Sequence, residues 1–119
     1  MLGGVDMCTK SRLAEITKDV VKTAAEIFGS RLSSVILYGS YARGDYDDES
    51  DIDIMIIADI STSEISKYSK MLTSYSVDVD LRENVVLSLM LQDKSTFDKY
   101  KNTYPFYRNV EAEGVELIA

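Results

Sequence analysis

Two aspartates, Asp51 and Asp53, stand two positions apart in the otherwise apolar segment DIDIMIIA. If this segment is a strand, its residues at i and i+2 share one face, and the two carboxylates lie roughly 7 Å apart along the chain. Two such charges repel each other near a low-dielectric surface, and a divalent cation relieves that repulsion. Mg²⁺ is the natural candidate because it takes oxygen ligands and is often shared between one or two carboxylates and substrate phosphates. The alternative is an exposed strand end with two solvated aspartates.

A Gly-Ser pair, Gly39 and Ser40, ends the apolar segment SVILY, and ten residues separate it from the aspartates. Glycine permits a tight turn and the close approach of a ligand to the backbone. The Ser40 hydroxyl and the N–H groups that follow it can hold a phosphate. The alternative is an ordinary strand-to-helix turn. If the turn and the aspartates face one cleft, the first binds a triphosphate and the second its metals, in a two-metal site that stabilises a leaving pyrophosphate.

Length and composition limit what else the chain can be. Its 119 residues suit one small domain, 1–119, in which we expect 1–8 to be loose. The net charge of −7 argues against general nucleic-acid binding, but not against a basic protein partner. One cysteine and no histidine exclude an internal disulfide, a histidine zinc site and a Ser-His-Asp triad. Without a signal peptide or a membrane-length apolar segment, a soluble cytoplasmic protein is expected.

The first half of the chain alternates helix and strand. Apolar residues at three- and four-residue steps predict an amphipathic helix over 10–28, followed by a glycine cap. The apolar segment 34–38 predicts a buried strand, YARG a short helix, and 44–50 a polar loop. The segment 51–58 predicts a second strand, with alternate isoleucines on one face and the two aspartates on the other.

The second half contains one ambiguous element. A helix capped by Ser61 or Thr62 extends to about residue 81, but alternation in Val77–Leu81 also fits a strand. The remaining predictions are a strand at 85–92, a helix at 95–100, a helix from Pro105 to near Gly114 and a small strand at 115–118. This order predicts an α/β (α+β) fold, with a small mixed β-sheet packed with helices.

The segment GSYARGDYDDESDID resembles the signature of the DNA polymerase β-like nucleotidyltransferases, which is Gly-Ser, ten residues and Asp-x-Asp after an apolar strand. From about residue 10 onward the chain looks like a minimal nucleotidyltransferase. The resemblance implies that Gly39 and Ser40 hold the nucleotide phosphates and that Asp51 and Asp53 bind the metals, with Ser40 and both aspartates as the catalytic residues. It adds two nucleotide-binding candidates, Arg43 and Ser50. Arg43 either neutralises triphosphate charge or is a solvated loop residue, and Ser50 either positions a phosphate or caps a turn.

Active members of that family usually carry a third carboxylate on a later strand, where it helps to deprotonate the acceptor hydroxyl. Asp78 or Asp80 supplies it if VDVDL is a strand. If the helix continues through residue 81, both are helix-surface acids, and the third-strand position falls in VVLSLML, which offers Ser88 and no carboxylate. The sequence favours the long helix slightly.

The resemblance implies transfer of AMP from ATP, with Mg²⁺, to a hydroxyl on a partner protein. Such chains resemble the antitoxin of two-gene systems, whose partner is often a helical HEPN-domain toxin modified on a tyrosine. One alternative is an antitoxin that binds nucleotide and acts by contact, and another is transfer to an aminoglycoside-like small molecule. The short chain leaves its cleft open, so a partner or a second copy should complete it. The aromatic residues near the C-terminus either form that surface or pack the core; they are Phe97, Tyr100, Tyr104, Phe106 and Tyr107.

Overall fold

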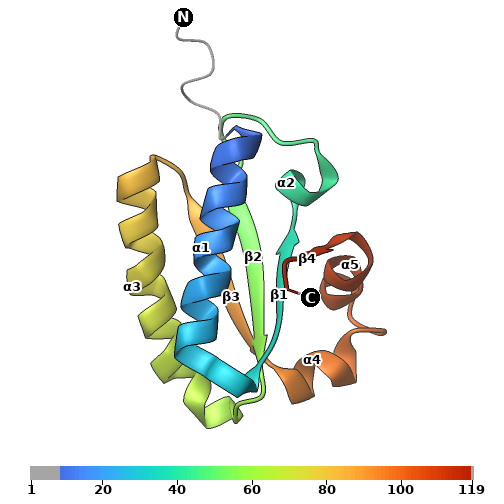
Figure 1. The fold of residues 1–119 in the computed structure, drawn as a ribbon. Coiled ribbons are helices and arrows are strands. Elements are labelled where there is room, and N and C mark those ends of the chain that lie inside the picture. Colours follow the sequence, from blue (N-terminus) through green and yellow to red (C-terminus); the bar gives the residue numbers. More distant parts are fainter. Residues whose placement is uncertain (1–8, 119) are drawn as a thin grey trace, which may run out of the picture.

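The computed structural model describes residues 9–118, which form a four-stranded sheet with helices on both faces (Figure 1). The expected loose segment 1–8 lies outside the described residues. The first helix, α1 (Lys10–Phe28), begins where the Thr9 side chain accepts a hydrogen bond from the Arg12 amide at 3.2 Å. It ends at Gly29, whose φ of 55° is typical of a helix-ending glycine. A 3-10 turn at Gly29–Arg31 leads into the sheet.

The sheet is mixed, as the sequence predicts. Its strands are β1 (Leu32–Tyr38), β2 (Ile52–Ala58), β3 (Leu87–Asp93) and β4 (Val115–Glu116), in the order β3-β2-β1-β4. β1 pairs antiparallel with β2 and with β4, whereas β2 and β3 are parallel. The predicted strands are all present with shifted ends, and Asp51 precedes β2 instead of opening it.

The alternation predicted for β2 divides the core into two layers. Ile52, Ile54 and Ile56 are at most 1% exposed and pack with α1 and α3. Met55 and Ile57 face the opposite side and pack with α4 (Lys94–Tyr100) and α5 (Pro105–Glu113). Asp53 shares this second face at the open end of the strand, because residues two apart on a strand point the same way. The aspartates therefore lie on the face that carries α4 and α5.

The ambiguous segment Val77–Leu81 is helical, so its interpretation as a strand is wrong. After a 3-10 turn at Thr62–Glu64 with a capping box between Ser61 and Glu64, α3 extends over Ile65–Glu83. It ends at Asn84, whose φ of 55° places it in the left-handed region.

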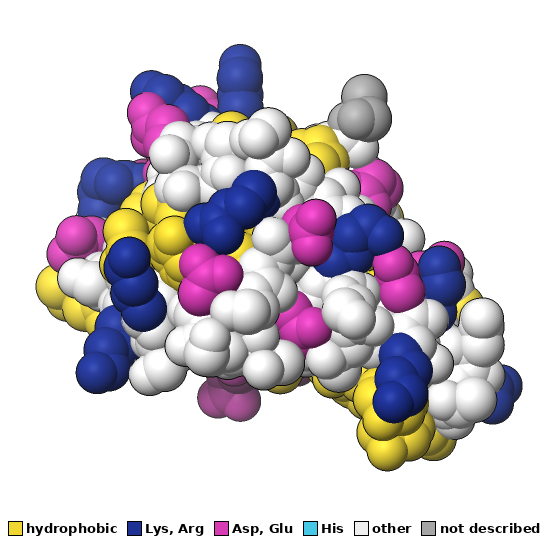
Figure 2. Space-filling model, turned by 90° about the horizontal axis from the view of Figure 1, so that it is seen from below, with side chains coloured by type: hydrophobic (Ala, Val, Ile, Leu, Met, Phe, Trp, Pro, Cys, Tyr) yellow, Lys and Arg dark blue, Asp and Glu magenta, His cyan; other side chains and the backbone are white. Residues whose placement is uncertain are grey.

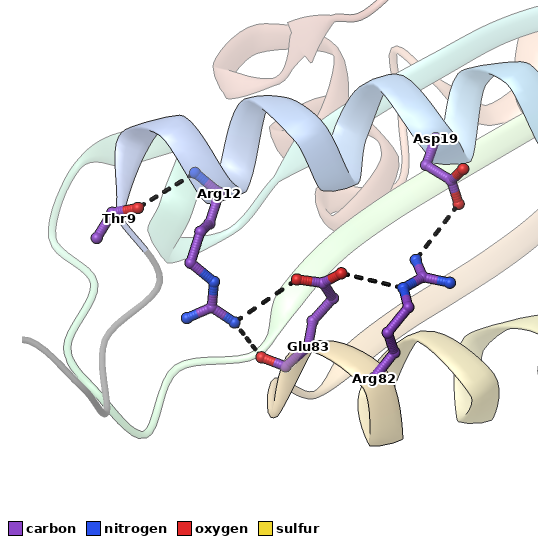
Figure 3. A network of polar contacts seen from close by, with 5 residues as sticks. All are labelled: Thr9, Arg12, Asp19, Arg82 and Glu83. Carbon is purple, nitrogen blue, oxygen red and sulfur yellow. Dashed lines mark hydrogen bonds and ion pairs between the residues drawn. The ribbon is translucent and has the colours of Figure 1, made fainter.

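A polar network joins the end of α3 to α1 and explains why the helix continues (Figure 3). The Arg12 guanidinium donates to the main-chain carbonyl of Glu83. The Arg82 guanidinium lies 3.0 Å from the Glu83 carboxylate and 3.7 Å from that of Asp19. The contacts of Arg12 with Glu83 and of Arg82 with Asp19 join segments far apart in the sequence, so the local alternation of valines and aspartates does not contain them.

The C-terminal aromatic residues divide between core and surface. Phe97 is buried, and Tyr100 and Tyr107 are half-buried, whereas Tyr104 and Phe106 are 51% and 44% exposed. Their rings form one connected cluster around Tyr107, with Tyr100 and Tyr104 stacked at 4.4 Å between centroids. Core packing is therefore confirmed for Phe97, and a partner surface formed by the exposed rings stays a prediction.

The end of the molecule opposite α2 (Ser40–Arg43) carries lysines, arginines and acidic residues interspersed (Figure 2). The acidic loop Asp45–Asp51 is on the other end, next to α2. The excess negative charge is thus not spread evenly, and part of it lies at the end where the two aspartates are. Within the described residues, no helix is long and apolar enough to cross a membrane.

Candidate active site

The turn after β1 and the start of β2 meet because these two strands pair antiparallel. Tyr38, the last residue of β1, is the cross-strand partner of Asp53. Gly39 follows with φ 75° and ψ −156°, a conformation that L side chains rarely adopt. A Cβ atom on Gly39 would lie 2.4 Å from Oδ2 of Asp53, so the carboxylate occupies the space that the missing side chain leaves. This contact brings the Gly-Ser turn and the aspartate pair to one site, as the sequence predicts.

The electrostatics of the site centre on Asp53. Burial raises the pKa of its carboxyl, and the nearby charge of Asp51 raises that pKa further, while Arg43 acts in the opposite direction. Burial and the charge of Asp53 also raise the pKa of Tyr38. The protein thus holds negative charge where part of the solvent is excluded, which favours a cation at this place.

Arg43 belongs to the site, and its guanidinium has carboxylate neighbours. It lies 3.1 Å from Asp45 and 4.0 Å from Glu113 of α5, although its side chain is 46% exposed. A cavity of about 300 Å³ opens beside it. The lining consists of residues from the turn and from α5, namely Tyr38, Gly39, Arg43, Phe106, Asn109, Val110 and Glu113.

Ser50 uses its hydrogen bonds within the polar loop. Its hydroxyl accepts from the Asp47 amide at 2.9 Å and lies 3.2 Å from the Asp47 carboxylate. Turn capping therefore describes the contacts of Ser50 in this structure, and a role toward phosphate stays a prediction. Ser40 begins α2 and is half-buried, and the Gly44 amide bonds to its carbonyl at 2.9 Å.

The strand beside the aspartates has no carboxylate at the position opposite them, and its one acid, Asp93, lies at the other end. Ser88 of β3 is the register partner of Asp53. Asp80 lies on α3, across the sheet, where its carboxylate accepts from the Leu87 amide at 2.7 Å, and Asp78 is exposed on the same helix. Neither is available as the third acid. Within residues 9–118, no group of three or more acidic, cysteine or histidine side chains could hold a metal.

Two carboxylates without a third fit Mg²⁺ that arrives with a nucleotide, since Mg²⁺ is usually held by one or two carboxylates together with substrate phosphates. Asp51 and Asp53 are the residues that would hold it, and the repulsion raising the Asp53 pKa is what such a cation would relieve. Sequence reasoning named Phe106 as a candidate surface aromatic but missed two other cavity residues of α5, Asn109 and Glu113. No local signal identifies them, because the packing of α5 against β1 brings them to the turn.

The nucleotidyltransferase domain family matches residues 11–107. The chain belongs to this family. Two relatives from Methanocaldococcus jannaschii carry the provisional name of protein adenylyltransferase. The first, MJ0604, is 37% identical over 98 residues, covering 82% of this chain and 89% of the relative. The second, MJ0141, is 36% identical over 92 residues, covering 76% and 93%. The chain is thus an enzyme of the nucleotidyltransferase class.

Solved structures share the fold. A crystal structure from Sulfolobus solfataricus, provisionally named a nucleotidyltransferase, superposes with a TM-score of 0.61 at 24% identity, covering 89% of this chain and 79% of that one. A mutant of the MntA–HpeT toxin–antitoxin complex superposes with a TM-score of 0.52 at 18% identity, covering 87% of this chain and 73% of that one. A toxin–antitoxin structure with AMP-PNP superposes with a TM-score of 0.50 at 19% identity, and it also covers 87% of this chain and 73% of that one. The polymerase β-like fold of this nucleotidyltransferase is therefore as the sequence predicts.

Proposed function

We propose that this nucleotidyltransferase moves AMP from ATP to a hydroxyl on a partner protein, with a divalent cation held by Asp51 and Asp53. The observation that carries the proposal is the Asp53 carboxylate seated against Gly39, with Asp51 beside it. A cation there would neutralise phosphate charge and so favour departure of pyrophosphate. The names of the Methanocaldococcus relatives support protein as the acceptor class, and the AMP-PNP in a structural neighbour supports an adenine nucleotide.

The transfer balances as a displacement at phosphorus. The acceptor oxygen forms a bond to the α-phosphorus of ATP, and the bond from that phosphorus to the bridging oxygen breaks. Pyrophosphate leaves with the electron pair, and the hydroxyl proton passes to water, since Ser88 stands where a carboxylate base would be. Gly39 and Ser40 would hold the phosphates. Arg43, which already lies near Asp53, would balance their charge.

The acceptor we favour is the toxin of a toxin–antitoxin pair in which this chain is the antitoxin. The MntA–HpeT neighbours support that kind of assembly, and a helical HEPN-type toxin is the partner that the sequence resemblance implies. Acidic residues next to the site, in the loop Asp45–Asp51, would favour association with a basic surface.

Radiolabel transfer tests the proposal directly. Purified protein is added to a lysate of its host with [α-³²P]ATP and Mg²⁺, beside Asp53→Asn and a matched control, Asp59→Asn. Asp59 is exposed just after the other end of β2, so its replacement leaves the site intact. We expect one labelled protein band with wild type and with Asp59→Asn, and none with Asp53→Asn. Equal labelling by all three proteins would show that Asp53 does not hold the required cation.

A second candidate is an antitoxin that binds Mg-ATP and neutralises its partner by contact alone. The observation that favours it is Ser88 in place of a third carboxylate, because this leaves the acceptor proton without a protein base. Binding of Mg-ATP without any labelled band in the lysate would select this candidate over transfer.

A further inference from the structure

The strand β3 forms one edge of the sheet, directly beside the aspartates. The main-chain carbonyl of Val86 accepts a hydrogen bond from the Ile52 amide at 2.8 Å. Since the main-chain groups of a strand alternate in direction, Ser88 and Met90 also direct theirs toward β2.

The alternate residues of β3 direct their main-chain amides and carbonyls away from β2, to the open edge of the sheet. These are Leu87, Leu89 and Leu91. Within residues 9–118, one hydrogen bond is found on that edge, from the Leu87 amide to the Asp80 carboxylate. The Leu89 and Leu91 amides therefore face outward, in position to pair with an added strand.

At Leu87 the Asp80 carboxylate of α3 occupies this edge, and beyond that residue the edge lacks the usual charges, prolines and bulges. Natural sheets guard their edges with such features or with a covering helix or loop. The segment Val85–Leu91 contains no charge and no proline, and the register with β2 is regular from Leu87 to Asp93. Two of its apolar side chains are exposed, Val86 at 54% and Met90 at 40%. An unguarded, partly apolar edge of this length is the form that strand-adding recognition uses.

The register connects this edge to the chemistry. Ser88 is the partner of Asp53, so the two side chains share a face of the sheet, and α5 lies beside β1 and β4 at the far side of that face (Figure 1). A residue on a strand added outside β3 would stand about 10 Å from Asp53, which is two strand spacings. A tyrosine there can extend its ring across Ser88 to the nucleotide, whereas a serine or threonine hydroxyl stays over its own strand.

The start of β3 also carries a pocket with acidic residues in its lining. A cavity of about 180 Å³ lies there, and two of its lining residues, Asp48 and Glu49, are acidic and exposed. Val86, which also lines it, is two residues from Ser88. A lysine or arginine two residues from the incoming tyrosine would enter this pocket and complement its charge.

We propose that the acceptor protein docks an extended segment, one that lies outside its helices, on the free edge of β3, with a tyrosine opposite Ser88 and a lysine or arginine two residues away in the acidic pocket. The inference rests on the proposed function and adds where its acceptor docks. The phenol oxygen of that tyrosine forms the bond to the α-phosphorus, pyrophosphate leaves, and the phenol proton passes to water.

The first test uses the lysate labelling assay with substitutions of Ser88. Ser88→Leu fills the path across β3, and we expect labelling of the acceptor to fall roughly tenfold or more while Mg-ATP binding is retained. Ser88→Ala keeps the path open and should label the acceptor as well as wild type does. This comparison separates the effect of blocking the path from any role of the Ser88 hydroxyl. The matched control is Ser74→Leu, the same change at an exposed site on α3.

The outcomes separate the two proposals. Full labelling by Ser88→Leu, with labelling lost in Asp53→Asn, would leave the transfer standing and overturn the docking inference. Full labelling by Asp53→Asn would instead overturn the proposed function.

The second test measures docking without transfer. The probe is a nine-residue peptide of valine and threonine, with a central tyrosine and a lysine two residues away on each side. On adding it, we expect slower amide hydrogen exchange at Leu89 and Leu91, and no change at Ser88 and Met90, which already face β2. Methylating the alternate peptide nitrogens that face β3 should abolish this protection, whereas methylating the other set should not. Unchanged exchange at Leu89 and Leu91 would contradict strand addition.

Discussion

The chain contains Asp-x-Asp in the polar loop, at the start of β2 and in α3. The pair at β2, Asp51 and Asp53, and the pair in α3, Asp78 and Asp80, differ in what they do. Asp51 and Asp53 share one face because side chains on a strand repeat every two residues. On a helix, positions two apart point in well separated directions, so Asp78 is exposed while Asp80 turns inward to the Leu87 amide. The same spacing concentrates charge in one element and disperses it in the other.

The largest expected difference between the pairs is in catalysis. We expect Asp53→Asn to lower AMP transfer on the order of 100-fold or more, because a carboxylate that would hold the cation is lost. Asp78→Asn, the matched change in the helical pair, should transfer at the wild-type rate. Initial rates of ³²P incorporation into the acceptor measure both. Similar losses in the two variants would mean that the pairs are not distinct in function.

The contact between Gly39 and Asp53 sharpens the comparison, since nothing similar constrains the helical pair. We expect Gly39→Ala to lower the free energy of unfolding by about 2–3 kcal/mol, from a strained backbone and the clash with the carboxylate. Gly44→Ala is the control, because its φ of 84° is also left-handed but its Cβ would meet nothing within 4 Å. It should cost about 1–2 kcal/mol. Urea unfolding of both variants measures the difference, and equal losses would show that the carboxylate moves aside freely.

The helical pair should show its own asymmetry in stability. Asp80→Ala removes the acceptor of the Leu87 amide, so we expect a loss of about 1–2 kcal/mol. Asp80→Asn keeps an oxygen in place and should lose less. Asp78→Ala should stay within about 0.5 kcal/mol of wild type, since its side chain is exposed. Thermal unfolding of the three variants measures this order, and a larger loss in Asp78→Ala than in Asp80→Ala would reverse the assignment.

The two pairs also show what the sequence could and could not predict. The strand pair was predictable because an apolar alternation surrounds it and a glycine turn precedes it at a fixed spacing. The helical pair was ambiguous because Val77, Val79 and Leu81 fit both periods. The contacts that decide it, from Arg82 to Asp19 and from Arg12 to the Glu83 carbonyl, join distant segments.

The surroundings of the site were less predictable than its acids. The register that sets Ser88 beside Asp53 arises from the pairing of β2 with β3, and α5 contributes Asn109 and Glu113 to the cavity through packing on β1. The sequence offers Ser88 at the third-strand position once the helix is taken as long, whereas the contribution of α5 has no local sequence signal. The contacts of Ser50 with Asp47 depend on the shape of the loop, which its polar composition does not specify.

The smallest expected effect is on the stability of the fold at Asp53, where the charged carboxylate that would hold the cation also destabilises the protein. Because its folded pKa is raised above the unfolded value of about 3.9, the charged form destabilises the fold. This penalty is present above the folded pKa and fades as the pH falls through it toward 3.9. Without Mg²⁺ at pH 7, Asp53→Asn should therefore melt slightly higher than wild type, on the order of 1–2 °C.

The difference in melting temperature between Asp53→Asn and wild type should shrink at low pH and change sign when Mg-ATP is added. Below about pH 3.9 the Asp53 carboxyl is protonated in both states, so the stability advantage of Asp53→Asn should vanish. Adding Mg-ATP at pH 7 should raise the melting temperature of wild type and leave that of Asp53→Asn nearly unchanged, because a ligand stabilises only a fold that binds it. Calorimetric scans at several pH values, with and without Mg-ATP, measure these shifts. A wild type more stable than Asp53→Asn in the absence of metal would mean that Arg43 outweighs burial and Asp51 in setting the charge of this site.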